Sequence, residues 1–430
     1  MTMKIAIIIE RANIILGGAE RSVFELANAI SKLGPKVDIL AATGSPRVFL
    51  SEDRSGGHRR TENVHILCRN ASGKRTCYFT FAKSLREHLS KNHYDVIHSV
   101  LPFDFADIYQ PRGGTYAESI LRNAASYQNK FIESYKKLTA FANFRRTILL
   151  RAERKLCQQP NGPTIIAISQ YVAEQFKRHY AAADDRIVVI PNGIKIHTRI
   201  DTEPAPALVF DKKTRGRGFD KLRSQILVQL GRGTRDEVRG TRDEPVLFLF
   251  VANNFRLKGL AVLIKAMQLA ANQGTRRPSF LIVVGNDREH KYRWLAKKFD
   301  PLMADKRIIF LGTIRHIQDV LSISDVAVLP TFYDPCSRYI LEALAAYKPV
   351  ITTSFNGATD LFVNNRHGKI IDSPEDVPAL AEAISYFTNT ENIQKASQAI
   401  AADNLKEKIS ISRVAKQLID VYESILKRKG

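Results

Sequence analysis

Two carboxylates stand eight positions apart in the segment TFYDPCSRYILEALAAYKPVITT, residues 331–353. Asp334 is followed directly by a proline, and Glu342 interrupts an apolar stretch. An Asp-Pro pair is a common helix start, which would make Asp334 the N-cap and Pro335 the first helical residue. A purely structural interpretation therefore exists: a cap at Asp334 and an i,i+4 ion pair between Arg338 and Glu342.

The position of this segment also favours ligand binding. It follows the apolar run VAVLPTF, which is typical of a buried strand, and α/β sheets bind ligands at the carboxyl ends of their strands. At the start of the predicted helix, the backbone N–H groups of Cys336 and Ser337 suit a phosphate group. One turn further on, the carboxylate of Glu342 can accept hydrogen bonds from a ribose diol.

Two other short motifs point to phosphate chemistry. NNFRLKGL (253–260) follows a predicted strand, and its cations Arg256 and Lys258 can stabilise negative charge in a partly dry cleft. Two solvated charges at a helix start are the alternative interpretation. LGGAERS (16–22) places Gly17 and Gly18 before a helix, where the backbone can approach an anion closely.

The elements that must position these motifs form two successive α/β patterns. In the first, KIAIII (4–9) predicts a buried parallel strand, followed by a helix over about 20–33 and a strand at KVDILAAT. The second begins at VLFLFVANN (246–254). We therefore predict an α/β fold of two doubly wound, Rossmann-like lobes. Strands are predicted at 94–100, 164–169, 186–194, 280–286, 307–313, 326–332 and 349–354.

The predicted domains are a first lobe (1–195), a polar linker (196–245), a second lobe (246–400) and a C-terminal helix (401–430) that packs across the lobes. The linker contains a short repeat, RGTRDEV and then RGTRDEP. Two copies cannot build a solenoid, so we interpret the repeat as a duplicated insertion loop. A basic tract for nucleic acid is disfavoured by the interleaved acidic residues.

The net charge of +22 over 430 residues predicts an anionic partner. Four scattered cysteines without metal spacing indicate a reducing compartment, and no leader or membrane-spanning helix is expected. We therefore expect a cytoplasmic protein, either soluble or attached to a surface. The basic and aromatic stretch 129–155 is either an ordinary lobe helix or one that lies on an anionic membrane leaflet.

The second half resembles the nucleotide-binding lobe of family 4 glycosyltransferases. The hallmark of that family is a pair of glutamates separated by seven residues, the second of which stands in the triplet LEA. This chain keeps the spacing as Asp334…Glu342, followed by LEALAAYKPVITT. The resemblance covers nearly the whole chain outside 195–245 and is strongest to enzymes of the lipopolysaccharide core glucosyltransferase I type. It implies the two-lobed GT-B fold, with a cleft between the lobes.

The resemblance also implies roles for individual residues. Lys258 matches a family lysine that binds the donor diphosphate, whereas Arg256 stands closer to it than the family arginine, whose position Asn253 occupies here. The resemblance further implies that Gly17 and Gly18 face the donor phosphates. In GTIRHIQDV, the residues implied to contact the nucleotide base are Gly312 and Thr313.

The activity implied is transfer of a sugar, UDP-glucose being the favoured donor, to a lipid-linked or lipopolysaccharide-core acceptor with retention of configuration. We expect no cofactor and no metal, because the second lobe has no Asp-x-Asp motif at a strand end and cations can replace a metal. On the acceptor side, the family's Asp is missing near Arg112. Asp107 and Arg112 are the catalytic candidates that remain.

Two other functions are alternatives to glycosyl transfer. A nucleotide-sugar epimerase on the same fold needs an acid/base pair deep in the cleft, and the sequence offers no convincing one. A non-catalytic binder of nucleic acid needs a stacking surface or a known module, and neither is visible. We therefore expect no nucleic-acid partner.

Overall fold

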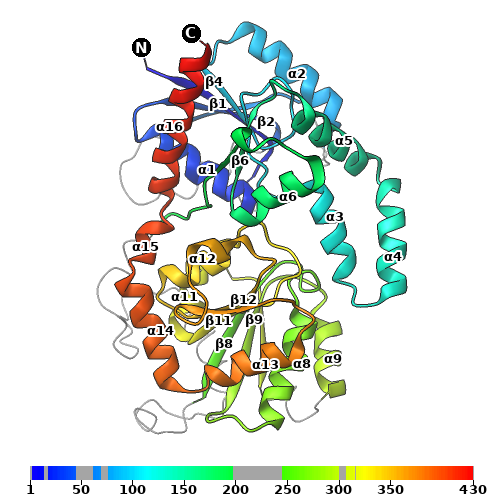
Figure 1. Ribbon diagram of the computed structural model, residues 1–430, viewed down its shortest axis with the longest axis vertical. Helices are drawn as coiled ribbons and strands as arrows, with labels where there is room; N and C mark the ends of the chain where they lie inside the picture. The colour runs from blue at the N-terminus through cyan, green and yellow to red at the C-terminus, as the bar shows by residue number, and fades with distance from the viewer. Residues whose placement is uncertain are drawn as a thin grey trace. The chain divides into compact units, whose positions relative to one another are not determined.

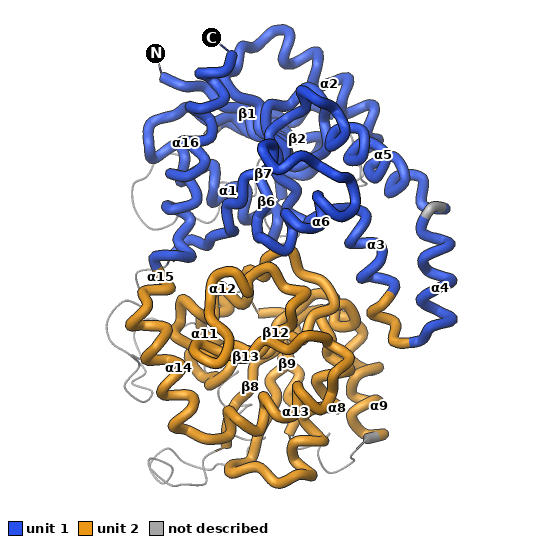
Figure 2. The backbone as a smooth tube through the Cα atoms, in the orientation of Figure 1, with its two compact units in different colours: residues 1–124, 129–196, 407–430 blue, residues 125–128, 197–406 orange. Residues whose placement is uncertain are grey.

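The computed structural model describes residues 2–13, 18–44, 62–68, 76–196, 245–299, 307–314 and 316–429, and every structural statement below concerns these residues. They form two compact units, coloured separately in Figure 2. Unit 1 comprises residues 1–124, 129–196 and 407–430, and unit 2 comprises residues 125–128 and 197–406. Gly17 and both copies of the RGTRDE repeat lie outside the described residues.

Unit 1 contains a seven-stranded parallel sheet in the order β3-β2-β1-β4-β5-β6-β7. The strands are β1 (Lys4–Ala12), β2 (Lys36–Gly44), β3 (Glu62–Ile66), β4 (Val96–Ser99), β5 (Ile108–Tyr109), β6 (Thr164–Ala167) and β7 (Ile187–Val189). The helices are α1 (Gly18–Ser31), α2 (Tyr78–Lys91), α3 (Tyr116–Ala125), α4 (Lys130–Thr139), α5 (Phe144–Gln158), α6 (Gln170–Tyr180) and α16 (Ile411–Lys429).

Helices cover both faces of this sheet, as alternate residues of β1 show. Ile5, Ile7 and Ile9 belong to a core shared with α1 and α16, whereas Ala6 and Ile8 belong to a core shared with α2. A strand buried on both faces needs apolar residues at successive positions, and KIAIII supplies them. The predicted doubly wound arrangement is confirmed (Figure 1).

The end of the chain divides between the two units. Residues up to 406 belong to unit 2 and residues 407–430 to unit 1, whereas the sequence analysis treats 401–430 as one segment that packs across the lobes. Helix α16 lies against α1 (Figure 1), with Val414, Leu418 and Tyr422 buried in the same core. The apolar face of this helix is therefore covered inside unit 1.

Unit 2 contains a six-stranded parallel sheet in the order β10-β9-β8-β11-β12-β13. The strands are β8 (Val246–Val251), β9 (Ser279–Val284), β10 (Ile308–Gly312), β11 (Val326–Leu329), β12 (Val350–Thr353) and β13 (Gly368–Ile371). The helices are α8 (Leu260–Asn272), α9 (Glu289–Phe299), α11 (Ile317–Ile323), α12 (Arg338–Ala345), α13 (Val377–Tyr386) and α14 (Thr390–Ala402). Helix α15 (Leu405–Lys408) contains residues of both units.

A buried carboxyl group joins several elements of unit 1. Glu153 on α5 is 0% exposed and accepts hydrogen bonds from the Tyr109 hydroxyl at 2.7 Å, the Tyr180 hydroxyl at 2.5 Å and the Tyr116 N–H at 2.8 Å. Burial raises the pKa of Glu153 from 4.5 to about 7, although the hydrogen bonds from Tyr180, Tyr109 and Tyr116 oppose the shift.

This pKa predicts how stability depends on pH. Between pH 4.5 and 7 the folded state keeps a proton that the unfolded state has lost, so the contribution of Glu153 to stability falls as pH rises through this range. The variant Glu153→Gln has no such titration. Relative to the variant, we expect the free energy of unfolding of the wild-type protein to fall by up to about 3 kcal/mol between pH 4.5 and 7. Urea unfolding of both proteins at several pH values measures this change. A difference in unfolding free energy that stays constant with pH would contradict the raised pKa of Glu153.

Candidate functional site

The loops after β8 and β11 meet where the strand order of unit 2 reverses. Such a reversal is the place where open α/β sheets bind ligands. The Lys258 ammonium, from the β8 loop, donates to Oδ2 of Asp334 at 2.7 Å and to the Tyr333 carbonyl at 2.8 Å. The lysine and aspartate side chains are 20% and 16% exposed. A partly shielded cation therefore stands at this switch point, in contact with the first acid of the predicted motif.

Gly259 explains how the two loops come so close. Its φ is +82°, and a Cβ at this position would lie 1.9 Å from the carbonyl oxygen of Pro330. Only glycine can adopt this conformation without a side chain striking the β11 loop. The close approach is also fixed by the backbone, since the Phe332 N–H donates to the Leu257 carbonyl at 2.9 Å.

The start of helix α12 differs from the prediction. Ser337 is its N-cap and Arg338 its first residue, so the expected cap at Asp334 is wrong. The reason lies in the loop after β12: the Asp334 N–H donates to the Phe355 carbonyl, and the Gly357 N–H donates to the Asp334 carbonyl, both at 2.9 Å. These bonds hold Asp334 in extended backbone, bridged to the loop, and delay the helix.

One of the two predicted phosphate donors of this helix also needs correction. The Ser337 N–H, expected to face a phosphate, donates instead to Oδ1 of Asn356 at 3.1 Å. The side chain of Cys336 is buried, with 6% exposure. The Ser337 N–H is therefore already bonded, whereas the N–H of Cys336 stays a predicted phosphate donor.

Glu342 lies one turn into α12 and forms the ion pair of the structural interpretation. Its Oε1 accepts from Nε of Arg338 at 2.9 Å, and the glutamate and arginine side chains are only 11% and 15% exposed. The rest of the helix face is apolar, with Ile340, Leu341 and Leu344 fully buried. The ion pair with Arg338 thus orients the Glu342 carboxylate, on the helix that follows the switch point.

The other donor-site candidates of unit 2 are spread along the sheet. The Arg256 guanidinium lies 3.8 Å from the centre of the Tyr127 ring and donates to the Ser126 hydroxyl. Gly312 ends β10, the outermost strand, with φ +67°, and its carbonyl accepts from the Gly285 N–H at 2.8 Å. Thr313 is exposed. Lys258, Asp334 and the start of α12 therefore form the compact part of the site.

In unit 1, Arg112 follows the carboxyl end of β5. Its Nη1 donates to Oδ1 of Asn192 at 3.2 Å, and the Ser22 hydroxyl, on the first turns of α1, donates to the same oxygen at 3.4 Å. Gly18 is the first residue of α1. These residues gather at the end of the sheet where ligands bind, so Arg112 remains a candidate.

Asp107 does not lie at this end of the sheet, and its assignment as a catalytic candidate is wrong. It precedes β5, at the amino ends of the strands. Its carboxylate accepts from the Ile97 N–H at 2.8 Å and pairs with the Lys429 ammonium at 2.6 Å. Asp107 therefore fastens the end of α16 to the sheet.

His98, on β4, has a structural role. Its Nδ1 lies 2.7 Å from the Tyr422 hydroxyl, and the residue is 1% exposed. Burial, together with the positive charge of Arg112, lowers the pKa of His98 to about 3. The imidazole is therefore neutral and joins β4 to α16.

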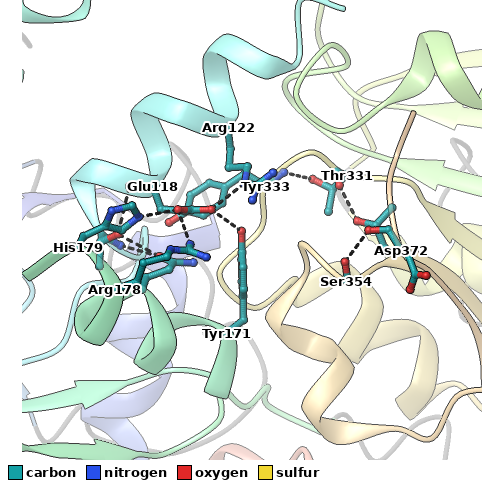
Figure 3. A network of polar contacts seen from close by, with 12 residues as sticks. Glu118, Arg122, Tyr171, Arg178, His179, Thr331, Tyr333, Ser354 and Asp372 are labelled. Atoms are coloured by element: carbon teal, nitrogen blue, oxygen red, sulfur yellow. Dashed lines mark hydrogen bonds and ion pairs between the residues drawn. The ribbon is translucent and has the colours of Figure 1, made fainter. Parts of the chain in front are cut away.

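A polar cluster that was not predicted from the sequence surrounds Glu118 (Figure 3). Its buried carboxylate on α3 accepts from Arg122 and Arg178 at 2.7 Å each and contacts the His179 ring nitrogen at 2.6 Å. Burial alone would raise the pKa of Glu118, but these partners outweigh it and lower the pKa. The spacing Glu118…Arg122 is the only sequence signal, and it indicates no more than a helical ion pair.

No group of three or more His, Cys, Asp or Glu side chains in the described residues is arranged to hold a metal ion. No helix in those residues is both long and apolar enough to cross a membrane.

Comparison with known families matches both halves of the chain. Residues 16–198 match Glycosyltransferase Family 4, and residues 232–404 match Glycosyl transferases group 1. Among curated proteins, the chain is 19% identical to lipopolysaccharide glucosyltransferase WaaG of Escherichia coli K12, over 86% of this chain and 85% of that protein. It is 24% identical to a D-inositol 3-phosphate glycosyltransferase of Nocardiopsis dassonvillei, over 95% and 90%.

Solved structures show the same fold. The crystal structure of WaaG, a glycosyltransferase involved in lipopolysaccharide biosynthesis, superposes with a TM-score of 0.68 at 16% identity, covering 97% of this chain and 99% of that one. Anabaena Alr3699/HepE in complex with UDP-glucose gives a TM-score of 0.64 at 17% identity, covering 98% and 100%.

Proposed function

Because the chain is a glycosyltransferase of the GT-B type, we propose that it transfers glucose from UDP-glucose to a hydroxyl group of a lipopolysaccharide core or a related glycolipid, with retention of configuration. The observation that carries this proposal is the Lys258 ammonium at the switch point of unit 2, held by Asp334 and the Tyr333 carbonyl. The proposed donor is also the one named in the HepE complex.

In the proposed reaction, the UDP diphosphate lies at this switch point, beside the start of α12. When the bond between the sugar and UDP breaks, negative charge builds on the diphosphate, and a fixed cation stabilises it most where water is partly excluded. Asp334 and the Tyr333 carbonyl hold the ammonium in place before the donor arrives. Lys258 thus supplies the charge that a metal supplies in other transferases, and we propose turnover without a metal.

The remaining contacts are proposed by position. Glu342 accepts hydrogen bonds from the ribose of UDP, and Gly312 and Thr313 contact the base. Gly17 and Gly18 offer backbone N–H groups to the donor phosphates, and of the two the structure describes Gly18, the first residue of α1. Arg112, at the carboxyl end of β5, acts on the acceptor side as a hydrogen-bond donor, a role different from that of the Asp missing here.

The role of Glu342 is testable because its ion pair can be broken from either side. We expect Glu342→Gln to weaken UDP binding at least about tenfold, since it removes a charged acceptor for the ribose hydroxyls. Arg338→Ala breaks the same ion pair but keeps the carboxylate, so we expect a smaller loss. Calorimetric titration with UDP measures both, and equal affinities for the two variants would leave Glu342 with a structural role only.

We further propose that unit 1 attaches to an anionic membrane surface through α4. The predicted basic stretch 129–155 forms two helices rather than one, because Asn143 caps α5 by accepting from the Arg146 N–H. Helix α4 has no buried residue. Its apolar side chains Phe131 and Leu138 are 88% and 78% exposed. Lysines 130, 136 and 137 lie on the same helix, a combination that suits an anionic leaflet.

Vesicle binding tests this surface. Phe131→Ser/Leu138→Ser should lower partition into phosphatidylglycerol vesicles at least about tenfold, because two apolar side chains no longer enter the interface. Phe79→Ser is the matched control, since Phe79 is also exposed (61%) but lies on α2. Binding of wild type should fall with added salt. Absence of binding at low salt, or an equal loss with the control, would refute the attachment.

A panel of UDP-, GDP- and ADP-sugars tests the function as a whole. We expect saturable binding and slow hydrolysis of a UDP-sugar, and transfer when a lipopolysaccharide-core acceptor is added. Epimerisation of the sugar without transfer would favour the epimerase alternative. If no nucleotide sugar binds to the wild-type protein, the proposal fails.

A further inference from the structure

A cavity of about 320 Å³ opens in unit 2 beside the turn that precedes β13 and helix α14. Because β13 is parallel to β8, the start of β13 is at the opposite end of the sheet from the Lys258 loop. The cavity is therefore separate from the donor site. Its volume is at the lower end of the range for small-molecule sites, which fits a ligand with a single sugar ring.

The charge around this cavity is positive. Lys395 lines it from α14, is exposed, and forms no ion pair with any described residue. Arg366 also lines it, but its charge is already balanced by a two-point contact with Asp403, at 2.6 and 2.7 Å. No carboxylate is among the lining residues. Lys395 can therefore bind an anionic group such as a phosphate without competition from an acid in the wall.

The polar side chains suit hydroxyl groups. Nδ2 of Asn392 donates to the Tyr386 carbonyl at 2.8 Å, so its Oδ1 is an acceptor directed elsewhere. Oδ1 of Asn365 accepts from Lys369 at 2.7 Å, so its Nδ2 remains a donor. A sugar hydroxyl both donates and accepts, and therefore matches one acceptor and one donor in the same cavity.

The aromatic wall completes the site. The ring of Tyr386 is 38% exposed although it packs edge-on against buried Phe387, at 5.1 Å between centroids. The Lys369 ammonium lies 4.1 Å from the ring centre and adds further positive charge. The part of the Tyr386 ring that the Lys369 ammonium leaves exposed can pack against the C–H groups of a pyranose. We propose that this cavity binds a phosphorylated monosaccharide.

Calorimetric titration of the full chain with glucose 6-phosphate, glucose and inorganic phosphate tests the proposal. We expect glucose 6-phosphate to bind at least about tenfold more tightly than either fragment, because only it uses both Lys395 and the amide–aromatic wall. Lys395→Ala and Tyr386→Ala should each weaken it about tenfold or more. Lys298→Ala, an exposed lysine on α9, and Lys258→Ala, in the donor site, should leave it unchanged.

Three results would overturn the proposal. One is the absence of saturable binding of glucose 6-phosphate, and another is loss of binding in Lys258→Ala with none in Lys395→Ala. The third is an affinity for inorganic phosphate equal to that for glucose 6-phosphate, which would mean that the cavity does not recognise the sugar. UDP titration of Lys395→Ala separates this site from the proposed function, since donor binding should be retained there whichever way the cavity experiment turns out.

Discussion

Lys258→Ala should lower kcat/KM for UDP-glucose by at least about 100-fold, the loss typical of removing one fixed group that stabilises developing charge. The ammonium is only 20% exposed and is held in place by Asp334 and the Tyr333 carbonyl, so bulk water cannot readily replace it. Lys258→Arg keeps the positive charge but changes its position, so its kcat/KM should lie between those of the alanine variant and the wild-type enzyme. Steady-state rates with UDP-glucose measure the three proteins.

The matched control is Lys291→Ala, which removes an exposed lysine from α9 in the same unit. It should keep wild-type activity. Thermal unfolding of each variant separates a lost charge from a lost fold. A Lys258→Ala enzyme that folds normally and keeps activity within about threefold of wild type, a difference under 1 kcal/mol, would contradict the role given to this lysine.

Gly259→Ala should destabilise unit 2 by about 3 kcal/mol or more, because it combines backbone strain with a collision. The new Cβ would lie 1.9 Å from the Pro330 carbonyl oxygen, which cannot move without shifting the loop that carries Asp334. Gly274→Ala is a close control, since Gly274 also has a φ of +82° but has no neighbouring atom within 4 Å of the added carbon. Gly274→Ala should destabilise the protein by about 1–2 kcal/mol, the contribution of backbone strain alone.

Urea unfolding followed by the fluorescence of Trp294 measures this pair, because the chain's one tryptophan lies on α9 in unit 2. The Gly259→Ala variant should also lose activity, since the added carbon displaces the loops that bring Lys258 to Asp334. Equal destabilisation of the two variants would mean that the approach of the β8 loop to Pro330 is not tight.

The longer strands were predictable because strands buried on both faces consist of consecutive apolar residues. KIAIII and VLFLFV are buried on both faces, and periodicity identifies such runs directly. The strands that escaped prediction are β3, β5 and β13. Strand β5 has two residues, and β3 (ENVHI) and β13 (GKII) are edge strands with polar residues or glycine, so their pairing depends on neighbours that a local pattern does not contain.

The candidate site was predictable in its residues but not in its local geometry. Lys258 and Asp334 were selected separately, yet their contact depends on Gly259 and on the reversal of strand order between β8 and β11. The cap at Ser337 was missed because Asp-Pro is a good helix start in isolation, and only the distant loop at Asn356 prevents it. Asp107 was misjudged because a sequence shows that a residue is near a strand, not which end of the sheet it occupies.

The most direct test of the central claim is a crystal structure of the chain soaked with UDP-glucose. We expect the diphosphate to bind at the switch point of unit 2, with an oxygen within hydrogen-bonding distance of the Lys258 ammonium and the ribose against Glu342. A diphosphate bound elsewhere, with Lys258 still paired only to Asp334 and the Tyr333 carbonyl, would contradict it.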